Sequence, residues 1–300
     1  MQLFLSAIQS ADHTIYNWLG RFAGNWVLDR LASQEEANNI FKGGMFFAIY
    51  WYFWFRAGAD RERRRRTIVV TVIAALLAVI VGRTISFLVP FRVRPMYDPA
   101  LLHPSYSIAL APNLENWSSF PSDAALYFFA LAFGIAYLSR RLTIPILLYT
   151  AGWICLPRLY LGVHYGSDIV AGAAIGMTVV WLLLKAERLQ PAFTQRLVGF
   201  AESSPHWFYP VSFLASFELA DLFNDIRNVG RAVLHAARVQ SCSGFMRAAF
   251  ATIGLTIAAG FTLTLLYRKP IHWRALHSFR NGGLRAQASQ HTHHQPLSAG

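Results

Sequence analysis

The segment TIVVTVIAALLAVIVGRTISFLVP, which occupies residues 67–90, decides the class of fold. Its only charged side chain is Arg83, and the basic run Arg61-Glu-Arg-Arg-Arg-Arg66 directly precedes it. An α-helix needs about 20 predominantly apolar residues to cross the hydrocarbon core of a bilayer. The segment therefore predicts a transmembrane helix with a basic anchor at its beginning.

The composition of the whole chain agrees with a membrane protein. Of the 300 residues, 55% are hydrophobic and only 14% are charged, whereas about a quarter of the residues of a soluble domain are charged. The net charge of +12 suits topology signals and anionic lipid headgroups. No basic-aromatic module or zinc spacing points to nucleic acid. The two cysteines, Cys155 and Cys242, exclude a disulfide framework and a Cys-rich metal site.

Five more apolar segments predict further spans, at 40–55, 123–138, 142–156, 169–184 and 248–267. Several of them have only 15 or 16 residues, so they cross a bilayer only if the polar residues at their outer ends join the helices. We therefore expect an all-α fold, a polytopic bundle of about six transmembrane helices.

The chain divides into four parts by composition. Residues 1–39 mix apolar side chains with polar ones such as Asp12, which indicates amphipathic helices at the membrane interface. Residues 40–190 form the transmembrane core, 191–273 a helical extension with a further span, and 274–300 a disordered polar tail. Within the extension, 206–223 either crosses the membrane or covers the cytoplasmic surface, and the sequence leaves both readings open.

The basic loops set the expected orientation. Arg61–Arg66, Arg140-Arg141 and Lys185–Arg188 fall on one face of the predicted bundle, and the positive-inside rule makes that face cytoplasmic. The junctions at 83–122 and 157–168 then face outward. We expect a bacterial inner membrane protein whose site lies on the outer, periplasmic face.

The outward junctions carry side chains that suit a phosphate group. Guanidinium groups bind phosphate oxygens bidentately, and a serine near a helix start adds a hydroxyl beside free backbone N–H groups. Ionisable residues at the ends of spans are functional candidates by default. The predicted phosphate-binding residues are Arg83, Arg92, Arg94, Ser122 and Arg158.

His164 and Asp168 provide a candidate nucleophile with its orienting group. Their spacing of four puts them on one helix face. Asp168 is then expected to take the proton on one ring nitrogen, which leaves the other nitrogen able to attack phosphorus.

Three blocks of sequence resemble the type 2 phosphatidate phosphatase superfamily, which includes bacterial undecaprenyl-diphosphate phosphatases. They are Arg92-x-Arg94-Pro95, Phe120-Pro121-Ser122-Asp123 and Arg158-x5-His164-x3-Asp168, and the resemblance covers roughly 67–185. It implies an all-helical core with no metal or other cofactor. It also implies a phosphohistidine at His164, oriented by Asp168, with the phosphate oxygens held by Arg94, Ser122 and Arg158.

The chain departs from the family pattern at three positions. Ala124 stands where the second block usually has the histidine that protonates the leaving group, a role worth typically about 10²–10⁴-fold. Phe87 replaces a lysine, whose charge Arg83 is expected to supply one helical turn earlier, and Pro157 replaces a serine. Asp123 and His103 are the candidate replacement acids.

The missing histidine bears on the substrate, because a diphosphate leaves as a stabilised phosphate and needs less protonation than an alkoxide. We expect a metal-independent phosphatase acting on a lipid diphosphate, such as undecaprenyl diphosphate, or on a lipid phosphate. The alternatives are a lipid phosphotransferase that shares the first half-reaction and a phospholipid-binding protein without turnover. The oligomeric state stays open.

Overall fold

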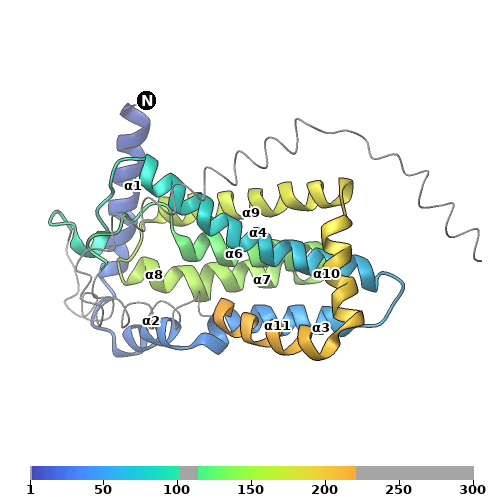
Figure 1. Ribbon diagram of the computed structural model, residues 1–300. Helices are drawn as coiled ribbons and strands as arrows, with labels where there is room; N and C mark the ends of the chain where they lie inside the picture. The colour runs from blue at the N-terminus through green and yellow to red at the C-terminus, as the bar shows by residue number, and fades with distance from the viewer. Residues whose placement is uncertain (1, 102–113, 221–300) are drawn as a thin grey trace, which may run out of the picture. The chain divides into compact units, whose positions relative to one another are not determined.

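The computed structural model describes residues 2–101 and 114–220 (Figure 1). The chain divides into two compact units, Met1–Leu255 and Thr256–Gly300, and all described residues belong to the first. These residues form helices and no strands, so the predicted all-α fold is confirmed. His103, the expected span at 248–267 and the tail at 274–300 lie outside the described residues.

Three helices form the centre of the bundle. They are α4 (Arg61–Leu88), α6 (Asp123–Leu138) and α9 (Gly166–Leu189), and each packs against the other two. Glycines permit the close approach of α6 and α9, because a Cβ at Gly176 would lie 2.2 Å from the Leu126 carbonyl oxygen. A Cβ at Gly172 would likewise lie 2.7 Å from the Ser122 carbonyl oxygen. Gly172 and Gly176 thus pack inside the bundle against α6.

A second layer of helices packs against α6. It contains the continuous helical stretch made of α7 (Thr143–Tyr149), the π-helix η4 (Thr150–Cys155) and α8 (Leu156–Tyr160). The π-helix η1 (Ile40–Gly44) continues into α3 (Met45–Phe55), whose end coincides with the predicted end of the first span. Aromatic residues of α3, including Phe46, Tyr50 and Trp54, are buried in the core.

Among the described residues, three helices are long and apolar enough to cross a membrane. They are Arg61–Leu88, Arg140–Tyr160 and Gly166–Leu189, and the apolar helix Asp123–Leu138 is shorter. The expected spans at 67–90, 142–156 and 169–184 correspond to the three long helices. The short runs 142–156 and 169–184 reach spanning length because residues on both sides join their helices, whereas the run 123–138 gains no residue and stays short.

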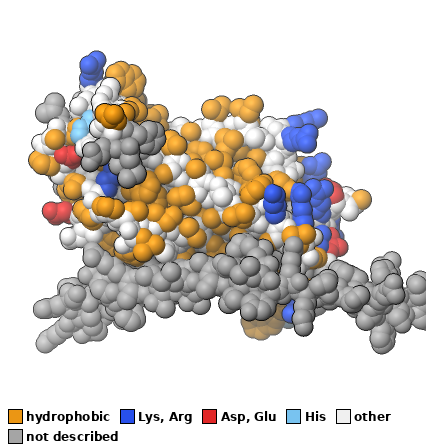
Figure 2. Space-filling model, turned by 90° about the horizontal axis from the view of Figure 1, so that it is seen from above, with side chains coloured by type: hydrophobic (Ala, Val, Ile, Leu, Met, Phe, Trp, Pro, Cys, Tyr) orange, Lys and Arg blue, Asp and Glu red, His pale blue; other side chains and the backbone are white. Residues whose placement is uncertain are grey.

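The basic clusters lie together at one end of the bundle. Arg66 at the start of α4 is 3.6 Å from Glu187 at the end of α9, and Arg188 lies over the ring of Tyr137 near the end of α6. Figure 2 shows Lys and Arg side chains gathered at one end of a largely apolar surface. The helix α10 (Ala192–Ser203) closes this end, where Glu202 pairs with Arg65.

The helix α11 (Pro205–Ala220) lies antiparallel alongside α3. Phe208 stacks on Trp54 near its beginning, while Ala220 contacts Gly43 at its end. The described part of 206–223 therefore runs alongside α3, and its crossing of the membrane stays a prediction.

Two helices precede the bundle, α1 (Gln2–Gly20) and α2 (Trp26–Ala37). Both pack against α8, and α1 also contacts α9. Exposed Trp18, Phe22 and Trp26 keep the predicted amphipathic character, but Asp12 and Tyr16 of α1 are buried. The first helix is therefore part of the folded unit at the end of the bundle opposite to the basic clusters.

Candidate active site

The candidate site lies where the connections from α4 to α6 and from α8 to α9 meet, at the end of the bundle opposite to the basic clusters. The Met96 N–H donates to the Gly162 carbonyl at 2.9 Å, and the Ser119 N–H donates to the Arg92 carbonyl at 2.8 Å. Gly162 has a φ of +69°, a left-handed conformation that favours glycine. A Cβ there would also lie 2.7 Å from the Tyr16 hydroxyl oxygen. These bonds join the segments that carry all three sequence blocks.

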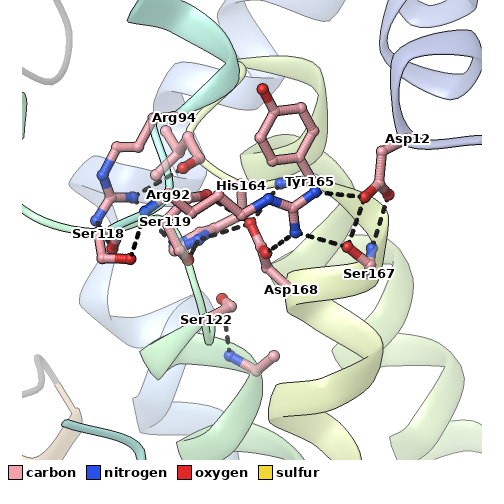
Figure 3. Close-up of polar contacts among 12 residues, drawn as sticks. Asp12, Arg92, Arg94, Ser118, Ser119, Ser122, His164, Tyr165, Ser167 and Asp168 are labelled. Carbon is pink, nitrogen blue, oxygen red and sulfur yellow. Dashed lines mark hydrogen bonds and ion pairs between the residues drawn. The ribbon is translucent and has the colours of Figure 1, made fainter. Parts of the chain in front are cut away.

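His164 is buried, and one of its ring nitrogens faces a backbone carbonyl (Figure 3). Its Nδ1 lies 2.8 Å from the Ser119 carbonyl oxygen, whereas the nearest Asp168 oxygen is 3.9 Å away. A carbonyl oxygen only accepts, so Nδ1 carries the proton and Nε2 keeps its lone pair. The predicted tautomer is thus fixed chiefly by Ser119 rather than directly by Asp168.

Asp168 is fully buried in the first turn of α9 and accepts several hydrogen bonds. The donors are the Ser119 hydroxyl at 2.5 Å, the Tyr165 N–H at 2.9 Å and Arg92 Nη1 at 2.5 Å. Because Ser119 contacts both the carboxylate and the ring, Asp168 acts on His164 through Ser119. Ser119 directly precedes the second block, but its spacing alone gave no reason to single it out.

Arg94 joins the connecting segments through hydrogen bonds and faces Nε2 of His164. Its guanidinium donates to the carbonyl oxygens of Trp117 at 3.1 Å, Ser118 at 3.3 Å and Val163 at 2.8 Å. Nη1 also lies 3.5 Å from His164 Nε2. Burial, helped by the charge of Arg158, lowers the pKa of Arg94 to about 10, so Arg94 stays cationic at neutral pH.

Positive charge and burial keep His164 neutral. Burial lowers the pKa of His164 well below 6.5, and the charges of Arg94, Arg158 and Arg83 lower it further. The hydrogen bond from Nδ1 to Ser119 opposes this shift. Three of the four predicted phosphate-binding arginines therefore act electrostatically on the predicted nucleophile.

Arg92 has a different environment from the other three arginines. Its Nη2 binds Asp12 at 2.7 Å, and its Nη1 binds Asp168 and Ser167. The guanidinium also lies over the Tyr165 ring, 4.1 Å from the centroid. The sequence predicted Arg92 as a phosphate ligand; the structure gives it two carboxylate partners, so its charge is compensated within the protein.

The remaining predicted residues lie at the ends of α4 and α6. Arg83 is hydrogen-bonded to Asp123 and lies over the Trp117 ring. Ser122 is fully buried, and its hydroxyl oxygen accepts from the Ala125 N–H at 3.4 Å as the N-cap of α6. Ala124 is also buried, 2% exposed, so the position of the missing histidine is filled by a methyl group inside the bundle.

Asp12 is a site residue that sequence reasoning missed. It accepts from Arg92 Nη2, from the Ser167 N–H at 2.9 Å and from the Ser167 hydroxyl at 2.5 Å. Nothing in the local pattern of residues 1–39 separates it from the other polar residues, because its partners lie far along the chain. Within residues 2–101 and 114–220, no three His, Cys, Asp or Glu side chains gather as a metal ion would require.

The fold and the site together define an all-α membrane protein with a buried neutral histidine that is close to several arginines. Residues 88–190 match the PAP2 superfamily, so this part of the chain is a PAP2 superfamily domain and the resemblance read from the three blocks is confirmed. One curated relative is the bacitracin transport permease protein BcrC of Bacillus licheniformis, 30% identical over 102 residues. Those residues make up 34% of this chain and 46% of BcrC, so the match spans less than half of the relative. No solved structure matches the chain.

Proposed function

We propose that this protein is a membrane lipid phosphatase that works through a phosphohistidine at His164. The observation that carries the proposal is the protonation state of the His164 imidazole. Nδ1 donates to the Ser119 carbonyl, and Nε2 keeps its lone pair 3.5 Å from a buried guanidinium. A neutral imidazole with one fixed tautomer is the form that attacks an electrophile.

The reaction has two steps. In the first, Nε2 forms a bond to phosphorus as the bond between phosphorus and the leaving-group oxygen breaks, and the leaving group departs with that electron pair. In the second, water attacks phosphorus, the P–N bond breaks and inorganic phosphate leaves. Arg94, Arg158 and Arg83 stabilise the charge on the transferring phosphoryl group, which is the main contribution that a protein makes to phosphoryl transfer.

The environment of α6 supports a diphosphate as the preferred substrate. The buried methyl group of Ala124 cannot donate a proton, and the Asp123 carboxylate accepts a hydrogen bond from Arg83. A leaving phosphate needs less protonation than a leaving alkoxide, so this site suits a lipid diphosphate such as undecaprenyl diphosphate better than phosphatidate. The exposed apolar surface of the bundle (Figure 2) provides a place for the prenyl chain.

The distribution of charge supports an outward-facing site. The Lys and Arg clusters lie at the opposite end of the bundle from His164, and the positive-inside rule assigns that basic end to the cytoplasm. We propose that the protein lies in a bacterial inner membrane with its site on the periplasmic face.

Phosphate release tests the proposal. The purified full-length protein in detergent and EDTA is given undecaprenyl diphosphate or phosphatidate, for the native chain and His164→Ala. His206→Ala is the matched control, because His206 is exposed on α11, away from the site. We expect release mainly from the diphosphate, lost in His164→Ala and kept in His206→Ala.

Other outcomes separate the alternatives. Equal release from phosphatidate would contradict the leaving-group argument. Transfer of the phosphoryl group to an added lipid alcohol, without release, would identify a phosphotransferase. Binding of both lipids without either reaction would make the protein a phospholipid-binding protein.

A further inference from the structure

Asp12 joins the first helix to the candidate site, although α1 lies outside the matched PAP2 region. Its side chain is only 3% exposed, and it accepts hydrogen bonds from Arg92 and from both the backbone and hydroxyl of Ser167 (Figure 3). Leaving a buried carboxylate without its partners is strongly unfavourable. This network therefore fixes α1 against the beginning of α9.

Arg92 extends this contact to the carboxylate beside the nucleophile. One side of its guanidinium holds Asp12 and the other holds Asp168. Asp168 accepts from the Ser119 hydroxyl, and the Ser119 carbonyl lies 2.8 Å from His164 Nδ1. A continuous series of polar contacts thus runs from Asp12 through Arg92, Asp168 and Ser119 to His164.

Neighbours of Asp12 on α1 also pack against the site and fix the position of the helix. Tyr16, one turn further along α1, is buried against Gly162. His13 stacks on the Tyr165 ring with centroids 6.0 Å apart, and the Tyr165 hydroxyl donates to Asp98 at 2.9 Å. Asp12 thus faces Arg92 from a helix that is fixed on both sides.

We propose that Asp12 is a positioning residue for the reaction at His164. It holds Arg92 between two carboxylates, and this keeps Arg92 from forming a two-pronged pair with Asp168 that would draw the carboxylate away from Ser119. The proposal rests on the proposed function for its kinetic consequence. Asp12 lies on the far side of Arg92 from His164, so its effect is on the orientation of the nucleophile.

The kinetic test uses Asp12→Asn, Arg92→Met and the double variant, with phosphate release from undecaprenyl diphosphate by the full-length protein. We expect Asp12→Asn to lower kcat about tenfold to a hundredfold, the range that small misplacements of reacting groups produce, with KM changed less than about twofold, because Asp12 does not face the phosphate. In the Arg92→Met background the same change should cost less than about twofold, since the two residues act as a unit.

The matched control is Asp29→Asn, which makes the same chemical change on α2. Asp29 accepts from the Tyr160 hydroxyl and has no contact with the series that leads to His164, so we expect native kcat. A native kcat in Asp12→Asn would overturn the proposal. An equal fold-change in kcat from Asp12→Asn in the native and in the Arg92→Met background would also overturn it, because Asp12 would then act only by docking α1.

A second measurement does not depend on turnover. Diethyl pyrocarbonate modifies neutral histidine, and peptide mass spectrometry gives the rate at His164 in the same preparations. We expect the modification rate at His164 to change, in either direction, by at least about threefold in Asp12→Asn and to keep its native value in Asp29→Asn. An unchanged rate at His164 would overturn the proposal. If the native chain releases no phosphate while the rate still changes, the proposed function fails and the positioning role of Asp12 stands.

Discussion

His164 Nδ1 lies 2.8 Å from the carbonyl oxygen of Ser119 and 3.9 Å from the carboxylate of Asp168. The nearer acceptor belongs to the backbone, so no side-chain substitution at position 119 removes it directly. The Ser119 side chain instead links that backbone to Asp168. The tautomer of the ring is thus set by a peptide group whose position is held by a buried carboxylate.

Ser119→Ala should therefore reduce the activity moderately rather than abolish it. The variant loses the hydroxyl bond to Asp168 but keeps the carbonyl, so we expect kcat for phosphate release to fall about tenfold. Asp168→Asn should give a similar or larger loss, and the double variant should be little worse than the worse single one. Steady-state kinetics of the three variants checks this. If the loss of kcat in the double variant equals the product of the two single losses, Ser119 and Asp168 do not act on His164 through one series of contacts.

The reactivity of His164 should persist at acidic pH. Burial and the charges of Arg94 and Arg158 lower its pKa well below 6.5, so the neutral, nucleophilic ring remains as the pH falls through 6.5 and is lost only at the lower pKa of the folded protein. The rate of modification by diethyl pyrocarbonate, measured from pH 4.5 to 8, reports this without interference from substrate ionisation.

Arg158→Met gives the internal check on that pH dependence. Removing the charge of Arg158 raises the pKa of His164, so the acid limb of the rate profile should move to higher pH. A midpoint near 6.5 in the native protein, or no movement in the variant, would contradict the electrostatic account.

Arg94→Lys should lower both the phosphatase activity and the stability of the protein. A lysine ammonium lacks the planar fork that reaches three carbonyl oxygens from two segments. We expect the free energy of unfolding to fall by about 2 kcal/mol, the order expected when buried carbonyls lose their donors, with phosphate release reduced at least about tenfold. Thermal denaturation in detergent measures the first effect. Arg188→Lys, on an exposed arginine at the basic end, should leave both quantities at native values.

Gly176→Ala should separate α6 from α9. The added Cβ would meet the Leu126 carbonyl oxygen at 2.2 Å, and overpacking of this kind typically costs about 1–3 kcal/mol. Gly152→Ala is the matched control, since nothing lies within 4 Å of its added Cβ. We expect a lower melting temperature only in Gly176→Ala. An equal change in both variants would show that the added methyl acts through helix propensity instead.

Much of the fold could be predicted because membrane helices leave strong signals. The apolar run at 67–90 predicted a helix because backbone polar groups in hydrocarbon must be hydrogen-bonded within the segment. The basic loops predicted which helix ends lie together at one end of the bundle. The resemblance of the three blocks likewise located the PAP2 domain. The placement of 206–220 could not be predicted, because Glu218 and the neighbouring Asp221 are equally compatible in the sequence with a surface helix and with a helix packed against other spans.

The sequence by itself determined that this is an all-helical membrane protein and which segment holds the candidate nucleophile, because length, hydropathy and the spacing between His164 and Asp168 are local properties. Only the tertiary structure decided what each polar group contacts. It gave the ring proton of His164 to the Ser119 carbonyl, and it placed Arg92 between Asp12 and Asp168. The physical reason is that buried charges and carbonyl groups must be satisfied by whichever partners packing brings near, and the distance between Asp12 and Arg92 along the chain leaves no trace of that pairing in the local sequence.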